Sequence, residues 1–322
     1  MPCSLRLGVL RLTDSAPVVL AESEGLFAAE GVEVAIQVEP SWANIADKLR
    51  WGALDAAVMP LPLALAAAAG LRGPATRLIV PMGISRGGNA VVVSSTLVTC
   101  LPEPLTPAAA PAFRAWLRDQ TVPPRVAVVH LFSTHNLLLR YWLGSVGVDP
   151  DRDLEIVVIP PERVVAELTA GRIAGFCAGA PWGDVAEATG SGRILLGSSS
   201  IRPRHTEKCL ALAGDWAADH PGPAAALSHA LQAAQRLCDQ PERSPAVAAL
   251  LARRLDLPEE VTPAALPGGN GIEQIAFAAA APLDPAEGLW FLREMRRWRW
   301  LGVDRDLEQL VADVYRSHLP LI

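Results

Sequence analysis

Short apolar runs rich in β-branched residues alternate with amphipathic stretches through the first two thirds of the chain. This alternation indicates βαβ units, in which parallel strands form a sheet and the connecting helices cover its faces. The strands predicted first are residues 5–10, 32–38, 54–59, 77–84 and 90–94, and the helices between them are residues 16–30, 41–52 and 61–70.

The same rhythm restarts after a proline-rich break at residues 102–107. Strands are predicted there at residues 125–129, 154–159 and 173–178, and helices at residues 108–119, 133–146 and 163–171. Helical patterns dominate after residue 210, at residues 224–239, 246–255, 285–300 and 307–317. The chain is therefore predicted to be an α/β protein with two lobes, each a mostly parallel sheet flanked by helices, and a helical C-terminal part.

Two short links, residues 91–95 and 209–214, are expected to carry the chain into a second lobe and back. Residues 1–92 would then form the first part of lobe 1, residues 93–210 lobe 2, and residues 211–322 the return to lobe 1 with the C-terminal helices. Two such sheets bind ligands between the carboxyl ends of their strands. A single doubly wound enzyme domain is the alternative, but no GxGxxG or GxxxxGK[ST] motif follows a strand.

The net charge and the N-terminal sequence indicate which partners and which location to expect for the chain. The net charge is −6, and no basic run is longer than Arg296-Arg297, so direct binding of nucleic acid is not expected. No apolar run could span a bilayer without a proline or a charge, which argues against membrane insertion. The first residues lead directly into a predicted strand and show no signal-peptide pattern, so a cytoplasmic location is expected.

The nucleophilic residues do not assemble into a catalytic pattern. The five cysteines are widely spaced with no CxxC pair, which is typical of buried thiols in a reducing compartment and predicts no metal site or other cofactor. Ser133 and His135 lie two residues apart on one predicted helix and point in different directions. Cys177 falls in an apolar strand, where burial raises the pKa of a thiol. We therefore predict that the chain is not an enzyme.

Several segments, in order along the chain, resemble the nitrate-binding branch of the type II periplasmic-binding-protein fold, which includes NrtA-like binding proteins and NasS-like cytoplasmic sensors. These segments are residues 12–17 (LTDSAP), 40–44 (PSWAN), 54–57 (LDAA), 88–90 (GNA), 135–143 (HNLLLRYWL), 170–177 (AGRIAGFC), 181–182 (PW) and 207–208 (EK). Two features depart from the family. Ala180 stands where an acidic residue commonly precedes the Pro-Trp pair, and residues 267–284 are short and rich in Ala and Gly.

The resemblance implies a nitrate site built from Trp42, Asn89, His135, a main-chain group around Ala178, and Lys208. Nitrate is a planar monoanion, so it requires hydrogen-bond donors around its edge and about one positive charge. Lys208 would supply the charge, and the indole, imidazole and amide groups would supply neutral donors. Trp42 and His135 each fall in the first turn of a predicted helix, where the helix dipole favours an anion.

Each of these side chains also has a simpler interpretation. Trp42 fits an apolar helix stripe, His135 could merely begin a helix, and Asn89 follows two glycines as a turn residue would. Lys208 would ordinarily be a solvated surface charge. However, of the 28 Lys and Arg residues only Lys48 and Lys208 are lysines, which suggests that a compact ammonium group is required at position 208.

The resemblance and the expected location together predict a cytoplasmic nitrate or nitrite sensor. Such a protein would close on the anion and release a regulatory partner, an RNA-binding antiterminator. The alternative is a solute-binding component, or a cytoplasmic regulatory domain, of an ABC-type nitrate/nitrite transporter. Related bicarbonate binders, as the resemblance implies, carry an acidic residue in place of the lysine and recruit a metal ion.

Overall fold

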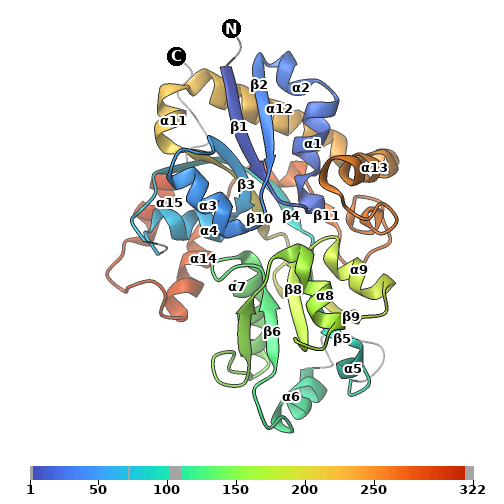
Figure 1. The fold of residues 1–322 in the computed structure, drawn as a ribbon. Coiled ribbons are helices and arrows are strands. Elements are labelled where there is room, and N and C mark those ends of the chain that lie inside the picture. The colour runs from blue at the N-terminus through green and yellow to red at the C-terminus, as the bar shows by residue number, and fades with distance from the viewer. Residues whose placement is uncertain (1–2, 72, 102–109, 316–322) are drawn as a thin grey trace.

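The computed structural model describes residues 3–71, 73–101 and 110–315, which form two sheets with helices packed on them (Figure 1). The first sheet has six strands in the order β11-β4-β10-β3-β1-β2. Its strands are β1 (Cys3–Val9), β2 (Val32–Val38), β3 (Ala56–Pro60), β4 (Leu78–Gly87), β10 (Thr206–Ala213) and β11 (Ile275–Ala276). Strands β1, β2 and β3 are parallel, and β10 runs antiparallel between β3 and β4.

The second sheet has five strands in the order β7-β6-β8-β5-β9. Its strands are β5 (Asn89–Ser94), β6 (Arg125–Val128), β7 (Glu155–Val158), β8 (Gly175–Gly179) and β9 (Gly192–Gly197). Strands β6, β7 and β8 are parallel, whereas β5 runs antiparallel to both of its neighbours. Each lobe thus combines a parallel βαβ core with one inserted antiparallel strand, and the two-lobed α/β architecture is as predicted.

The chain passes between the lobes at places other than those expected. It leaves the first sheet after Gly87 and enters the second at Asn89, because both Gly87 and Gly88 have positive φ angles that allow a sharp change of direction. It returns through α10 (Ser198–Ile201) into β10. Residues 91–95 and 209–214 were expected to be links, but they lie largely within β5 and β10. The strand pattern therefore places the crossings several residues before positions 92 and 210.

Two groups of helices cover the first sheet. One group contains α1 (Ala16–Ser23), α2 (Leu26–Ala29), α12 (Pro221–Cys238) and α13 (Ser244–Leu255). The other contains α3 (Trp42–Arg50), α4 (Leu61–Ala68), α14 (Pro285–Arg297) and α15 (Leu307–Val314). A short α11 (Gly214–Asp219) follows β10. The apolar faces of these helices pack on the sheet and enclose a large core. This core includes Leu5 and Leu7 of β1, which are both fully buried.

The second sheet is covered by α5 (Ser95–Val98), α6 (Ala110–Arg118), α7 (Thr134–Ser145), α8 (Val164–Thr169) and α9 (Trp182–Ala188). A second core lies within this lobe, where Phe113 of α6 packs against Trp142 of α7. Helix α7 also contacts α14 of the first lobe, so the lobes touch along their helices as well as at the crossings (Figure 1). Within the residues described, no helix has the length and apolarity needed to cross a bilayer.

Most predicted elements are present, and the differences have local causes. The predicted helix at residues 16–30 is divided into α1 and α2 because Gly25 adopts a positive φ of 69°. Strands β9 and β10 were not predicted, since neither has a clear apolar alternation at its start. The beginning of the helix expected at residues 108–119 and the end of that at residues 307–317 lie outside the described residues.

Candidate functional site

The only lysine of β10, Lys208, is fully buried between β3 and β4. Its ammonium Nζ lies 2.8 Å from Asp14 Oδ2 and 2.5 Å from Glu207 Oε1. A buried charge requires such partners, because desolvation without them is very unfavourable. The surface-charge interpretation of Lys208 is therefore wrong. Its charge is also already shared with two carboxylates, which the sequence did not indicate.

Glu207 lies at the centre of a buried polar cluster that also contains Asp14, Asn89, His135, His205 and Lys208. Its Oε2 accepts a hydrogen bond from Asn89 Nδ2 at 2.5 Å, and His135 Nε2 lies 3.6 Å from Oε1. His205 Nε2 lies 3.7 Å from Oε2. Successive side chains of a regular strand point to opposite faces, yet the carboxylate of Glu207 reaches the ammonium of Lys208. The register of β10 against β4 shifts on both sides of Lys208, and this irregularity lets the two side chains meet.

The first turns of α3 and α7 position two of the predicted ligand residues. Ser41 caps α3 by accepting a hydrogen bond from the backbone of Asn44, and Trp42 follows as the first helical residue. The Trp42 ring is almost fully buried, with its centroid 5.3 Å from Lys208 Nζ, so it also makes a cation–π contact. Fully buried His135 is the second residue of α7. Both helix starts therefore lie near the lysine.

Asn89 and the end of β8 supply the opposite wall. Asn89 opens β5 and pairs with Gly179, whereas Ala178 pairs with Ala90 within the ladder. A Cβ placed on Gly179 would lie 3.5 Å from both Asn89 Oδ1 and His135 Nε2. The main chain that approaches the cluster is thus that of Gly179, one residue after the predicted Ala178. At that distance a Cβ would make ordinary van der Waals contact with the amide and the imidazole.

Several buried polar atoms of this cluster have no hydrogen-bond partner within the described structure. They are Thr13 Oγ1, Asp14 Oδ1, Trp42 Nε1, Asn89 Oδ1, His205 Nε2, and both ring nitrogens of His135. Buried polar groups are nearly always hydrogen-bonded to protein, water or a ligand. The Thr13 hydroxyl, the Trp42 indole N–H and one ring N–H of neutral His135 can each donate a hydrogen bond, so the cluster offers donors to a small polar ligand.

The charge states follow from burial and the neighbouring ions. Burial lowers the pKa of His135 to about 3, so its imidazole is neutral at pH 7. Burial alone would raise the pKa of Glu207, but Lys208 and the nearby histidines outweigh it and bring this pKa to about 2. Burial raises the pKa of Asp14 despite the lysine. Burial disfavours the Lys208 cation, yet Asp14 and Glu207 raise its pKa above the ordinary value.

His135 makes the stability of the protein sensitive to acid. Its pKa falls from 6.5 to about 3 on folding, so between these values the unfolded state binds a proton that the folded state does not. The free energy of unfolding should therefore decrease as the pH falls below ~6.5, by up to about 1.4 kcal/mol per pH unit. Urea denaturation between pH 7.5 and 5 should show a flatter pH dependence for His135→Asn.

The exposed His229 provides a matched control for that measurement, because its side chain is 58% accessible and lies 3.8 Å from Glu30. His229→Asn should retain the wild-type pH dependence. Equal slopes for wild type and His135→Asn would show that His135 is not held neutral by burial.

The cluster lies where the two lobes meet. Thr13 in lobe 1 donates its backbone N–H to Ala180 O in lobe 2 at 2.9 Å. Asn89 belongs to the second sheet and bonds to Glu207 of the first. The expectation that Asn89 lies in lobe 1 is wrong, because β5 pairs with β8 and β9. Lys208 in turn lies within the lobe 1 sheet and not at a link, so both lobes contribute directly to the site.

The enzyme alternative finds no support in this geometry. Ser133 Oγ donates to His130 O and accepts from the backbone of Asn136, so it is a helix cap and not a nucleophile. Burial raises the pKa of the Cys177 and Cys209 thiols well above the usual range. Among the residues that the structure describes, no group of three or more His, Cys, Asp or Glu side chains is arranged to hold a metal ion.

Two α/β lobes with a buried polar cluster between them define the chain as a protein of the periplasmic-binding-protein fold. Residues 2–252 match the NMT1-like family, and the chain belongs to this family. The crystal structure of the periplasmic nitrate-binding protein NrtA from Synechocystis superimposes with a TM-score of 0.88 at 26% identity, covering 98% of this chain and 86% of NrtA. The resemblance inferred from the sequence is confirmed.

Two import proteins of Synechocystis sp. are also similar. The nitrate import ATP-binding protein NrtC is 33% identical over 340 residues, which cover 98% of this chain and 49% of NrtC. The bicarbonate transport ATP-binding protein CmpC is 32% identical over 328 residues, which cover 97% of this chain and 48% of CmpC. The chain thus spans about half the length of these relatives. The similarity to nitrate-binding NrtA proteins supports the prediction that the chain is not an enzyme.

Proposed function

We propose that this chain binds nitrate or nitrite between its lobes, with Lys208 as the central cation and Trp42, His135, Asn89 and the backbone at Gly179 around it. The observation that carries the proposal is the set of unpartnered buried atoms around the Lys208 ammonium. A small planar anion accepts hydrogen bonds from the Trp42 indole and the His135 imidazole at its edge. Similarity to the nitrate-binding NrtA supports this choice of ligand.

The charges of the cluster favour a monoanion over a dianion. Lys208 contributes one positive charge, while Glu207 and ionised Asp14 contribute two negative charges. An anion entering a buried site of net charge −1 is repelled unless a proton enters with it. Asp14 is the group suited to hold that proton, because its pKa is raised. Sulfate is a dianion, so its second negative charge would also have to be compensated in the buried site. It should therefore bind far more weakly than nitrate.

Ion choice tests the proposal directly, since the relatives include both a nitrate and a bicarbonate import protein. Calorimetry of the purified chain against nitrate, nitrite, bicarbonate and sulfate should show binding of nitrate or nitrite alone. The Lys208 ammonium supplies the positive charge of the proposed site, so calcium should not change the affinity. Bicarbonate binding that depends on calcium would overturn the proposal.

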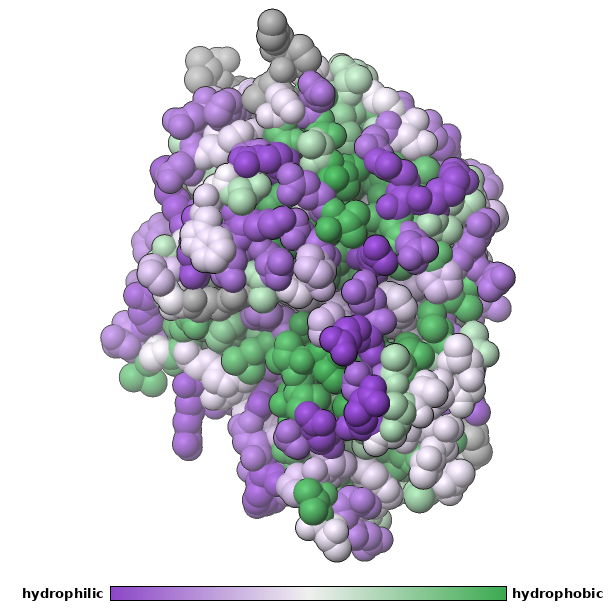
Figure 2. Space-filling view, viewed as in Figure 1, coloured by the Kyte–Doolittle hydropathy of each residue, from purple (hydrophilic) through white to green (hydrophobic). Residues whose placement is uncertain are grey.

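We further propose that closure of the two lobes on the anion changes the binding of a protein partner. A ligand contacting both lobes shifts the population toward the closed form and so changes any surface that spans the lobes. Exposed apolar residues occur at strand ends on both lobes: Val38 ends β2, Val158 ends β7, and Leu131 follows β6. Figure 2 shows apolar surface on this face of both lobes, with polar side chains around it. The proposed partner is a cytoplasmic RNA-binding antiterminator, held in the anion-free form.

This role can be tested by purifying the chain with its partner from cells lacking nitrate. Gel filtration with millimolar nitrate should separate the two proteins, and the partner should weaken nitrate binding by the factor by which nitrate weakens the complex. A complex unchanged by nitrate would contradict the sensor role. The second candidate, a solute-binding component of a nitrate importer, is supported by the similarity to NrtC and NrtA.

A further inference from the structure

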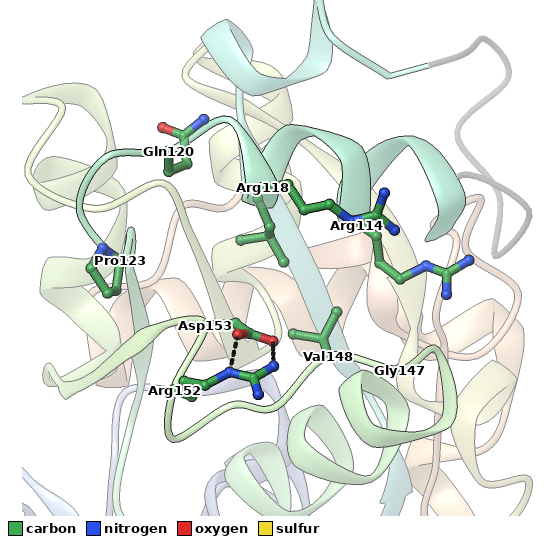
Figure 3. Close-up of a pocket in the computed structure, with 9 residues that line it drawn as sticks. Arg114, Arg118, Gln120, Pro123, Gly147, Val148, Arg152 and Asp153 are labelled. Carbon is green, nitrogen blue, oxygen red and sulfur yellow. Dashed lines mark hydrogen bonds and ion pairs between the residues drawn. The ribbon is translucent and has the colours of Figure 1, made fainter.

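We infer that lobe 2 carries a second anion site, separate from the cleft, which binds the phosphate group of a small phosphorylated molecule. The site is a pocket of about 310 Å³ between α6 and the segment that leads from α7 to β7. Figure 1 places α6 at the end of lobe 2 that is far from lobe 1. In Figure 3, Arg114 and Arg118 extend from α6, and the Arg152–Asp153 pair lies on the opposite wall.

Arg114 and Arg118 bring two guanidinium groups to this pocket. Within the described residues neither Arg114 nor Arg118 forms an ion pair, and Arg114 Nε is enclosed without a hydrogen-bond partner. Like charges four residues apart destabilise a helix by about 0.2–0.5 kcal/mol. Gly147 lies beside one of them, since a Cβ there would make an ordinary van der Waals contact with Arg114 Nη1 at 3.4 Å. An anion between the two arginines would relieve their repulsion.

The opposite wall carries an ion pair between two neighbouring residues. Arg152 donates to both carboxylate oxygens of Asp153, at 2.8 Å from Nε and 3.3 Å from Nη2. Asp153 Oδ2 also accepts the backbone N–H of Asp149 at 2.8 Å. The Arg152–Asp153 pair is neutral as a unit, so Arg114 and Arg118 leave the pocket with two positive charges, although the chain as a whole carries −6.

These features select the class of ligand. The planar fork of arginine matches the oxygens of phosphate and carboxylate groups, and two unpaired charges favour a dianion, which a phosphate monoester is near neutral pH. The volume is close to the lower end of about 300–1,000 Å³ for small-molecule sites. Leu117 and Val148 add apolar surface for a short carbon skeleton. A small phosphate ester therefore fits the pocket better than a free halide or a nucleic acid.

The test is calorimetry of the full chain at low ionic strength with inorganic phosphate and with glycerol 3-phosphate. Both should bind, the ester at least as tightly as phosphate. The double variant Arg114→Gln/Arg118→Gln should weaken both by about tenfold or more, the range expected when hydrogen bonds to a charged group are lost. Arg114→Lys keeps the charge but loses the fork, and it should also weaken binding. Arg253→Gln, at an exposed arginine of α13, is the matched control and should change nothing.

Several results would overturn this inference. They are no binding of either phosphate compound, unchanged affinity in the double variant, or loss of phosphate binding in Lys208→Met, which would place the phosphate in the cleft. Melting temperatures of the variants should match that of the wild type, since Arg118 is exposed and Arg114 makes no ion pair in the described part of the chain. Nitrate affinity should be unchanged in the double variant, so this test is independent of the cleft proposal.

Discussion

Replacing Lys208 by methionine should weaken nitrate binding by about thirtyfold or more, because removal of a charge that pairs with a buried ligand costs about 2–5 kcal/mol. Methionine retains most of the apolar volume of the lysine stem but leaves Asp14 and Glu207 buried without their cation. Breaking a buried ion pair typically lowers stability by about 3–5 kcal/mol. Calorimetry and urea denaturation of the same preparation would measure both effects.

The other lysine of the chain is the matched control. Lys48 lies on α3, pairs with Glu39 at 2.6 Å and has a side chain that is 37% exposed, outside the cluster. Lys48→Met should leave nitrate affinity near that of the wild type. The double variant Lys208→Met/Glu207→Gln removes one of the orphaned charges and keeps the test valid if the single variant is too unstable. Near-normal nitrate affinity in a folded Lys208 variant would remove this residue from the site.

Replacing Asp14 by asparagine should strengthen nitrate binding at alkaline pH and remove its pH dependence. In the wild type a proton must accompany the anion, so the affinity should fall as the pH rises past the Asp14 pKa, by at most about tenfold per pH unit. A like charge about 5 Å away is unfavourable by about 3 kcal/mol at an effective dielectric constant of ~20, or about a hundredfold in affinity. Asparagine keeps an oxygen for Lys208 and removes this charge.

Calorimetry of nitrate binding in buffers of different ionisation enthalpy would count the protons taken up. The titratable groups of the cluster are Asp14, His135, His205, Glu207 and Lys208, and the Asp14→Asn variant should reduce the uptake toward zero if Asp14 is the acceptor. Asp55→Asn, at a carboxylate that binds Arg6 at 2.7 Å elsewhere in lobe 1, is the control. Proton uptake that persists in Asp14→Asn would assign the proton to a histidine instead.

The parts of the fold that local patterns specify were predictable. Residues 32–38 alternate clearly and form β2 with the predicted bounds. Ser41 and Ser133 each precede a helix and accept a hydrogen bond from the backbone N–H three residues later, which is the usual chemistry of a helix start. Trp42 and His135 could therefore be placed in first turns from the sequence alone.

The rest depends on contacts between distant segments. Strand β10 begins with Thr206, Glu207 and Lys208, which a hydropathy pattern assigns to a surface loop. They are buried because Asp14, from the start of the chain, and Glu207 compensate the lysine. Asp14 lies in residues 12–17, one of the segments that resemble the family, and no other local signal pointed to it. No local signal pointed to His205. The irregular register that brings Glu207 and Lys208 together is likewise invisible in the sequence, because it arises from pairing with β4.

The central claim is that a small anion lies between Lys208, Trp42 and His135. A crystal structure of the wild-type chain grown in nitrate would test it most directly. We predict planar, three-fold density in the cleft, with oxygens at hydrogen-bond distance from Lys208 Nζ, Trp42 Nε1 and a ring nitrogen of His135, and with the lobes closed on it. Nitrate bound elsewhere, or a cleft that holds only water at saturating nitrate, would contradict the claim.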